Sequence, residues 1–188
     1  MDYLIYGSIG LAVIIILWLL LKSKKQSNPD SELVREIGKS DPKKDYYVLS
    51  GIEFHDGVRS AKIDHLIINP SGIHAVLEYL HDGYIEGFEQ DHSWSFEYKG
   101  VSDSFDNPIH TARLLKQSID KVLKKDLPIF LYVVFPKDAE LPKKRMPLPV
   151  IHSDELNDYL DKNFRSKKRI SSNDVIMTYE LFNKVKNN

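Results

Sequence analysis

The sequence predicts an α/β fold, a central mixed β-sheet flanked by helices, preceded by one N-terminal transmembrane helix. Three patterns predict it: an uncharged apolar run at residues 3–21, strand-like segments between residues 46 and 98, and a helical pattern followed by a buried strand after residue 107. Apolar helices and strands in this order bury their faces by packing in layers around a shared core. A chain of 188 residues has the length of one domain with a short appendage.

The N-terminal run has the length of a membrane-spanning helix. Residues 3–21 contain no charged side chain, and about 20 apolar residues suffice to cross the hydrocarbon core. Lys22, Lys24 and Lys25 follow the run, whereas Asp2 is the single charged residue before it. The positive-inside rule then predicts a single-pass protein of the cell membrane, with its N-terminus outside and the rest in the cytoplasm. A cleaved signal peptide needs the opposite order, with basic residues first.

We divide the chain into three predicted parts: an anchor at 1–22, a juxtamembrane linker with a short helix at 23–44, and a cytoplasmic domain at 45–188. The linker is polar and contains a proline. Residues 31–38 predict the short helix, because Leu33 and Ile37 lie one helical turn apart.

Strands are predicted at 46–54, 61–69 and 72–80, and a further one at 93–98. Each is rich in β-branched or aromatic residues and is bounded by turn-forming residues. Asn69 to Gly72 predicts a tight turn, because Pro70 suits its second position.

Helical periodicity begins after residue 107, with a proline in the first turn. The continuous apolar run at 128–135 predicts a strand buried on both faces. A short strand is predicted near residue 150. Ser153 and Ser172 are predicted N-caps of two final helices, because acidic residues follow each of them.

Composition excludes several classes of site. Without cysteine there is no disulfide framework, zinc-thiolate site or thiol nucleophile. The seven histidines show none of the spacings of a zinc motif. A formal net charge of −1 argues against a protein that coats nucleic acid along its whole surface. Two local basic clusters are candidate contacts to nucleic acid, or to the anionic inner leaflet, although such runs are usually solvated loops: Lys143, Lys144, Arg145 and Lys167, Lys168, Arg169.

The block "KIDHLIINPSGIHAVLEYLHDGYIEG" at 62–87, followed by Trp94 and by "NPI" at the start of a helix, resembles the nuclease-related domain family (NERD). That family is a branch of the restriction-endonuclease-like PD-(D/E)xK superfamily, so the resemblance implies a restriction-endonuclease-like sheet. It also implies a divalent metal held by an Asp and by the Glu of an E-x-K motif, with the Lys helping water to attack a phosphodiester.

Carried over residue by residue, Asp64 matches the family Asp, and Glu32 is the counterpart of a helix Glu. The glycines match on both sides of the E-x-K position, at Gly72 and Gly83. This frame puts Leu77 at the Glu position and Tyr79 at the Lys position. Glu78 falls between them and faces the other side of the strand, since strand side chains alternate. Lys62 and Lys99 are the lysines that could reach the site from another strand.

The resemblance therefore predicts a membrane-anchored NERD protein with a degenerate E-x-K motif, a pseudoenzyme of a bacterial membrane. We expect it to bind a nucleic acid or a protein partner at the inner face, with no cofactor. In the alternative, it is a weak nuclease acting on DNA or RNA with Mg²⁺ or Mn²⁺. Asp64 and Glu32 would then hold the metal, with Asp64 and a vestigial Glu78 as the catalytic carboxylates.

Overall fold

The structure is a computed structural model that describes residues 32–55, 60–123, 125–165 and 170–187. These residues belong to one compact unit that begins at Glu32. The predicted membrane span at 3–21 lies outside the described residues. Among the helices that are described, none has the length and apolar character that crossing a membrane requires.

Five strands form the main mixed sheet, in the order β1-β2-β3-β7-β8. The first two pairings are antiparallel and the last two are parallel. The tight turn that begins at Asn69 joins β2 to β3. The two strands pair from His65 opposite Val76 to Asn69 opposite Gly72. The strands are Tyr47–His55 (β1), Ser60–Asn69 (β2), Gly72–Glu78 (β3), Ile129–Phe135 (β7) and Val150–His152 (β8).

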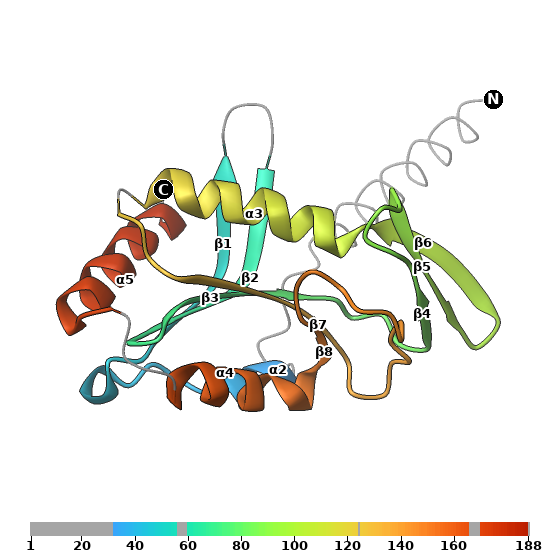
Figure 1. The fold of residues 1–188 in the computed structure, drawn as a ribbon, viewed down its shortest axis with the longest axis horizontal. Coiled ribbons are helices and arrows are strands. Elements are labelled where there is room, and N and C mark those ends of the chain that lie inside the picture. The colour runs from blue at the N-terminus through green and yellow to red at the C-terminus, as the bar shows by residue number, and fades with distance from the viewer. Residues whose placement is uncertain (1–31, 56–59, 124, 166–169, 188) are drawn as a thin grey trace, which may run out of the picture. The chain divides into compact units, whose positions relative to one another are not determined.

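Between β3 and the next helix the chain builds a second, three-stranded antiparallel sheet, ordered β4-β5-β6. Its strands are Tyr84–Glu86 (β4), Ser93–Tyr98 (β5) and Val101–Asp106 (β6). The turn between β5 and β6 is Lys99-Gly100, and both residues have positive φ, as a two-residue hairpin turn requires. This small sheet lies at one end of the main one (Figure 1).

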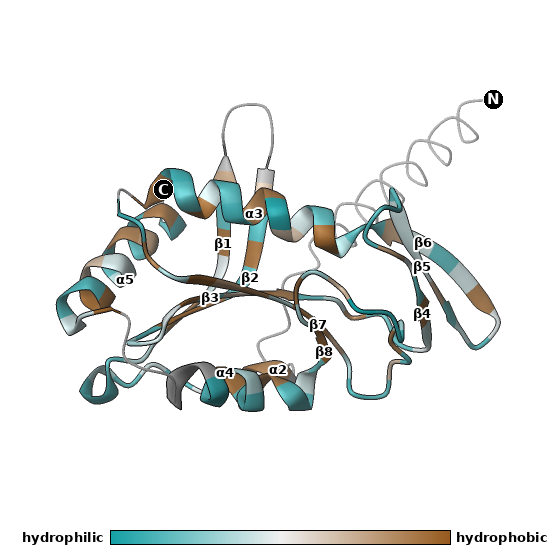
Figure 2. Cartoon of the chain, in the orientation of Figure 1, coloured by the Kyte–Doolittle hydropathy of each residue, from teal (hydrophilic) through white to brown (hydrophobic). Residues whose placement is uncertain are grey.

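Helices cover both faces of the main sheet (Figure 1): α3 and α5 lie on one face, and α2 and α4 on the other. Each helix turns its apolar side towards the sheet and its polar side away (Figure 2). The helices are Glu32–Ile37 (α2), Pro108–Val122 (α3), Leu156–Arg165 (α4) and Ser172–Lys186 (α5), with short 3-10 helices at Pro42–Lys44 and Ser153–Glu155.

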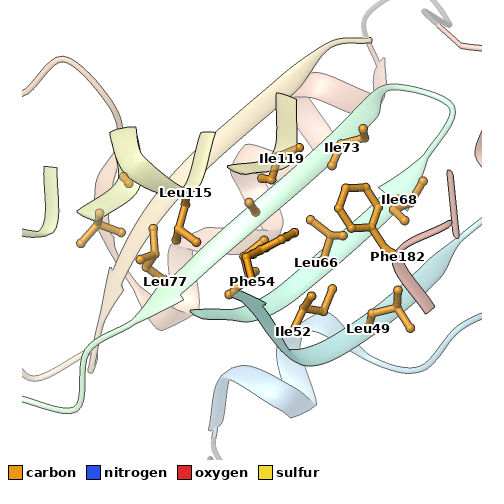
Figure 3. Packing of buried hydrophobic residues seen from close by; sticks show 14 of the residues in the cluster. Leu49, Ile52, Phe54, Leu66, Ile68, Ile73, Leu77, Leu115, Ile119 and Phe182 are labelled. Carbon is orange, nitrogen blue, oxygen red and sulfur yellow. The ribbon is translucent and has the colours of Figure 1, made fainter. Parts of the chain in front are cut away.

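The larger core lies between the sheet and the pair α3 and α5 (Figure 3). Leu115 and Ile119 of α3 and Phe182 of α5 are fully buried against strand residues such as Leu66 and Ile73. The ring of Phe182 meets Phe54 edge-on, with ring centroids 6.2 Å apart. Helix α5 is therefore part of the fold's main core.

The pairing of β1 with β2 skips Gly51 and Asp64, which lie between the pairs Ser50–His65 and Ile52–Ile63, and the alternation of side chains is interrupted there. Leu49 and Ile52 belong to the same core cluster although they are three residues apart, and so do Ile63 and Leu66. Strict alternation would place residues of one face an even number apart. Gly51 has a φ of 67°, which only glycine adopts without strain. Asp64 therefore lies outside the regular alternation of side chains along β2.

A buried polar chain crosses the second core, on the α2 and α4 side. Ser71 Oγ donates to Asn69 Oδ1 at 2.6 Å, so it accepts from His74 Nε2 at 2.8 Å. His74 Nδ1 lies 3.0 Å from the Tyr132 hydroxyl. Buried polar groups need such partners, because an unpaired one costs about 1–3 kcal/mol.

The predicted strands and the long helix after residue 107 are confirmed within one or two residues at their ends. Three details were wrong. Ser153 is not an N-cap but the first residue of the 3-10 helix Ser153–Glu155, whose N-cap is His152. The helix α5 is capped by Ser171, whose Oγ accepts from Asp174 N, and not by Ser172. Strand β6 was not predicted, because its serine and aspartate residues have low strand propensity and pairing with β5 determines its conformation.

Replacing Phe182 by alanine should lower the free energy of unfolding by about 3–5 kcal/mol, because it leaves a cavity in the main core. Chemical denaturation of the full-length protein measures this loss. Met177 on the same helix is 59% exposed, so Met177→Ala should change the stability by less than about 0.5 kcal/mol. Equal effects of the two substitutions would contradict the packing of α5 described above.

Candidate functional site

Asp64 lies where β2 and β3 part. The last paired residues of these strands are His65 and Val76, and beyond them the two strands separate. The Asp64 carboxylate enters the gap, where its Oδ2 accepts a hydrogen bond from Glu78 N at 2.9 Å. Its Oδ1 lies 3.3 Å from Lys62 Nζ. The carboxylate thus satisfies a backbone N–H that lost its strand partner.

The Glu78 side chain belongs to a different group of residues, on the α2 and α4 side of the sheet. Its Oε2 lies 3.4 Å from Nε2 of the buried His65. His65 Nδ1 in turn lies 2.8 Å from Ser50 Oγ. The Glu78 carboxylate is therefore engaged by His65, in a chain of contacts that continues to Ser50.

Leu77 and Tyr79 face the opposite side, towards α3. Leu77 is 3% exposed and lies in the main core. The ring of Tyr79 stacks on Phe135 at 5.4 Å and lies 5.3 Å from Phe105. Burial raises the pKa of Tyr79 to about 12; its hydrogen bond with Thr111 opposes the rise, and the negative charges of Asp64 and Asp106 add to it. Tyr79 is thus a neutral phenol at any physiological pH.

The two carboxylates at this site, Asp64 and Glu78, are engaged by groups of the protein itself. Mg²⁺ binds through oxygen ligands, mostly carboxylates and water. Among the described side chains, no group of three or more His, Asp or Glu residues is arranged to hold a metal ion. Glu32 is the first residue of α2, on the other face of the sheet from Tyr79. The side chain of Glu32 lies outside the described part of the structure.

Two lysines were candidates to reach the site, Lys62 and Lys99. Lys62 does lie beside the Asp64 carboxylate. Lys99 instead lies in the β5–β6 turn, over the ring of Tyr98 at 4.8 Å. The sequence analysis missed Thr111, whose spacing on α3 carries no signal until the helix is docked beside Tyr79.

The first basic cluster lies in the loop between β7 and β8. Its three residues, Lys143, Lys144 and Arg145, are all exposed. Lys144 Nζ lies 3.8 Å from the centroid of the Phe88 ring, a cation–π contact. The second cluster, Lys167, Lys168 and Arg169, lies outside the described residues. The idea that the two clusters form one surface stays a prediction.

Comparison with known proteins identifies a family that matches this chain. Residues 30–136, more than half of the chain, match the family described as "Nuclease-related domain" (NERD). An uncharacterized protein of Bacillus anthracis is 30% identical over 143 residues, which cover 72% of this chain and 66% of that protein. The chain thus spans just under two thirds of that relative. No solved structure was found to match.

The alkaline stability of the protein should report the environment of Tyr79. Because the pKa of Tyr79 is about 12 in the fold and 10.0 when unperturbed, the folded state favours the neutral phenol. This stability is complete below pH 10 and is lost as the pH rises towards 12. Denaturation at several pH values should show a smaller fall for Tyr79→Phe than for the unsubstituted protein.

Tyr46 is the matched control, because burial also raises its pKa to about 12, on the opposite face of the sheet. Tyr46→Phe should remove a separate part of the same fall. If the stability of Tyr79→Phe falls with rising pH in parallel with that of the unsubstituted protein, the Tyr79 hydroxyl is not buried.

Proposed function

This chain belongs to the NERD family, and on that basis we propose that it is a catalytically degenerate member which acts by binding. The partner is a nucleic acid or a protein at the inner face of a bacterial membrane. A nuclease-like module is what the family match supports, and the mixed sheet with helices on both faces is consistent with a restriction-endonuclease-like core. Loss of catalysis, binding and membrane attachment are our proposal.

One observation carries the loss of catalysis: Leu77 and Tyr79 stand at the family's Glu and Lys positions, inside an apolar and aromatic cluster. A buried leucine offers no ligand to a metal. A neutral phenol offers no positive charge to a phosphate, and a pKa of about 12 makes it a poor general base near neutral pH. The two groups that would hold the metal and help the attacking water are both absent from these positions.

The carboxylates nearby support the same proposal. Asp64 is engaged by Glu78 N and Lys62, and Glu78 by His65. A metal at Asp64 would have to compete with a backbone hydrogen bond and with a lysine cation. Such a site binds Mg²⁺ weakly, because Mg²⁺ gives up its water molecules reluctantly.

One contact favours the alternative of a weak nuclease. Lys62 is two residues before Asp64, and its Nζ lies 3.3 Å from that carboxylate. A lysine in this place could assist an attacking water even though Tyr79 occupies the family Lys position. In that case Asp64, Glu78 and Glu32 would carry Mg²⁺ or Mn²⁺.

Attachment to the membrane rests on the sequence of residues 3–21 and on the lysines that follow. A tether would confine the module to a thin layer beside the inner leaflet. Confinement raises the effective concentration of the module near a membrane-bound partner. A modest affinity is then enough for the two to bind.

We expect no Asp64-dependent cleavage by the purified full-length protein with Mg²⁺ or Mn²⁺, because the site lacks the required second carboxylate and lysine. Single- and double-stranded DNA and RNA are the substrates to test. Asp64→Ala and Lys62→Ala are the matched variants. Metal-dependent cleavage that disappears in both variants would contradict a degenerate site and support the alternative.

Binding should remain in the absence of cleavage. Binding to a fluorescent oligonucleotide, measured at rising salt, would identify nucleic acid as the partner if its affinity falls steeply. The variant in which Lys143, Lys144 and Arg145 are replaced by glutamine should then lose most of that affinity. Affinity that is unaffected by this variant would exclude the first basic cluster as the contact.

The membrane fraction should contain the full-length protein and should retain it after an alkaline carbonate wash, because a spanning helix is not released by breaking electrostatic contacts. A variant with residues 3–21 deleted should move to the soluble fraction. Release of the full-length protein by carbonate would contradict the proposed anchor.

A further inference from the structure

A pocket lies on the α2 and α4 side of the main sheet, and none of its lining residues belongs to the group around Asp64 and Glu78. Its volume is about 360 Å³, which is in the range of small-molecule sites, roughly 300–1,000 Å³. Three parts of the chain form its walls: residues 39–46 between α2 and β1, the end of β2, and α4. We call it the Asn69 pocket, after the residue at its floor.

Asn69 is the most deeply buried residue that lines the pocket, with 2% of its surface exposed. Its Oδ1 accepts hydrogen bonds from Ser71 N at 2.8 Å and from Ser71 Oγ at 2.6 Å. These two bonds fix the orientation of the amide, so its Nδ2 end points away from the turn. In the described part of the chain, no group accepts a hydrogen bond from Asn69 Nδ2. Buried amide donors nearly always have a partner, so Asn69 offers a donor to an oxygen atom of a ligand.

Hydrogen bonds hold the walls of the Asn69 pocket in place. The Tyr46 hydroxyl donates to Ile37 O at 2.8 Å, which fixes the aromatic ring. Asn157 Nδ2 donates to Glu36 O at 3.0 Å and to Glu36 Oε2 at 2.7 Å, and these bonds join α4 to the end of α2. The walls are therefore in place before a ligand binds, and little conformational entropy is lost on binding.

The mouth of the pocket carries charges of both signs. Lys44 Nζ lies 3.3 Å from Asp41 Oδ2, so these two charges offset each other. Asp161, which also lines the pocket, has an interaction partner of its own. Lys39 is exposed, and none of the described residues forms an ion pair with it. Lys39 is therefore the charge that an anionic group of a ligand would meet.

We propose that the Asn69 pocket binds a small organic anion that carries a carbonyl group. The carbonyl oxygen accepts a hydrogen bond from Asn69 Nδ2 at the floor, and the anionic group lies beside Lys39 at the mouth. Tyr46 and Leu160 provide apolar contact between the two ends of the ligand. This binding site goes beyond the proposed function, because it uses neither the Asp64 and Glu78 group nor the two basic clusters.

Two probes of this class test the proposal: uridine monophosphate, in which a flat ring carries the carbonyl, and N-acetylleucine, in which an acyl group carries it. Binding to the full-length protein in neutral detergent is measured by isothermal titration calorimetry, with the heat of detergent alone subtracted. At least one probe should bind with a dissociation constant below about 1 mM. Uridine lacks the anionic group and ribose phosphate lacks the carbonyl, so each should bind more weakly than uridine monophosphate.

Three variants test the two ends of the pocket. Asn69→Asp keeps the oxygen that accepts from Ser71 and removes the donor, so the probe should bind about tenfold more weakly. Lys39→Gln should weaken binding by about threefold, as expected for an exposed charge. Asp161→Asn should strengthen binding, because it removes a negative charge from the pocket.

Matched controls make the same exchanges outside the pocket. Asn173→Asp changes an exposed amide on α5, and Lys43→Gln changes an exposed lysine of the neighbouring 3-10 helix that does not line the pocket. Both controls should bind the probe as the unsubstituted protein does. Thermal unfolding without the probe shows whether Asn69→Asp is folded. If it is not, the comparison of Lys39→Gln with Lys43→Gln decides, because both lysines are exposed.

Two results would overturn the inference. In the first, neither probe binds to the unsubstituted protein, which would mean that Asn69 Nδ2 serves only solvent. In the second, the pocket variants and their matched controls lose affinity equally, which would place the probe elsewhere on the surface.

Discussion

The hydrogen bond from Glu78 N to the Asp64 carboxylate organises this end of the fold. It forms where β2 and β3 separate, and it replaces the strand contact that the backbone N–H has lost. Gly51 makes it possible, because its positive φ interrupts the alternation opposite Asp64. The same arrangement leaves β3 paired with β7, where Tyr79 N donates to Val134 O. The direction of each side chain from Leu77 to Tyr79 follows from this pairing.

In our proposal, these directions let a nuclease-like frame lose its reaction and keep its fold. The residues at the Glu and Lys positions face α3, where Leu77 adds to the main core and Tyr79 joins Phe105 and Phe135. A carboxylate and an ammonium at these two positions would have to be solvated or paired, whereas leucine and tyrosine extend the apolar cluster. Leucine and tyrosine at these positions add packing, and in our proposal they also remove the chemistry. The Asp64 carboxylate has a structural role, because it accepts the hydrogen bond from Glu78 N.

The sequence predicted the parts of this structure that depend on local pattern. The strands around the turn at Asn69, the buried strand β7 and the helix α3 follow from periodicity and turn residues. The matching glycines on both sides of β3 also gave the positions of Leu77 and Tyr79. What the sequence could not give depends on contacts between distant segments. Strand β6 forms by pairing with β5, and Thr111 reaches Tyr79 only after α3 docks.

We propose that Asp64 does not act as a metal ligand in this protein. Titration of the full-length protein with Mn²⁺, followed by electron paramagnetic resonance of the free ion, tests it without any assumption about a substrate. Parallel titrations of Asp64→Ala and of the exposed control Asp158→Asn separate specific from surface binding. We expect all three proteins to bind Mn²⁺ equally weakly. Stoichiometric binding to the unsubstituted protein and to the control, but not to Asp64→Ala, would contradict it.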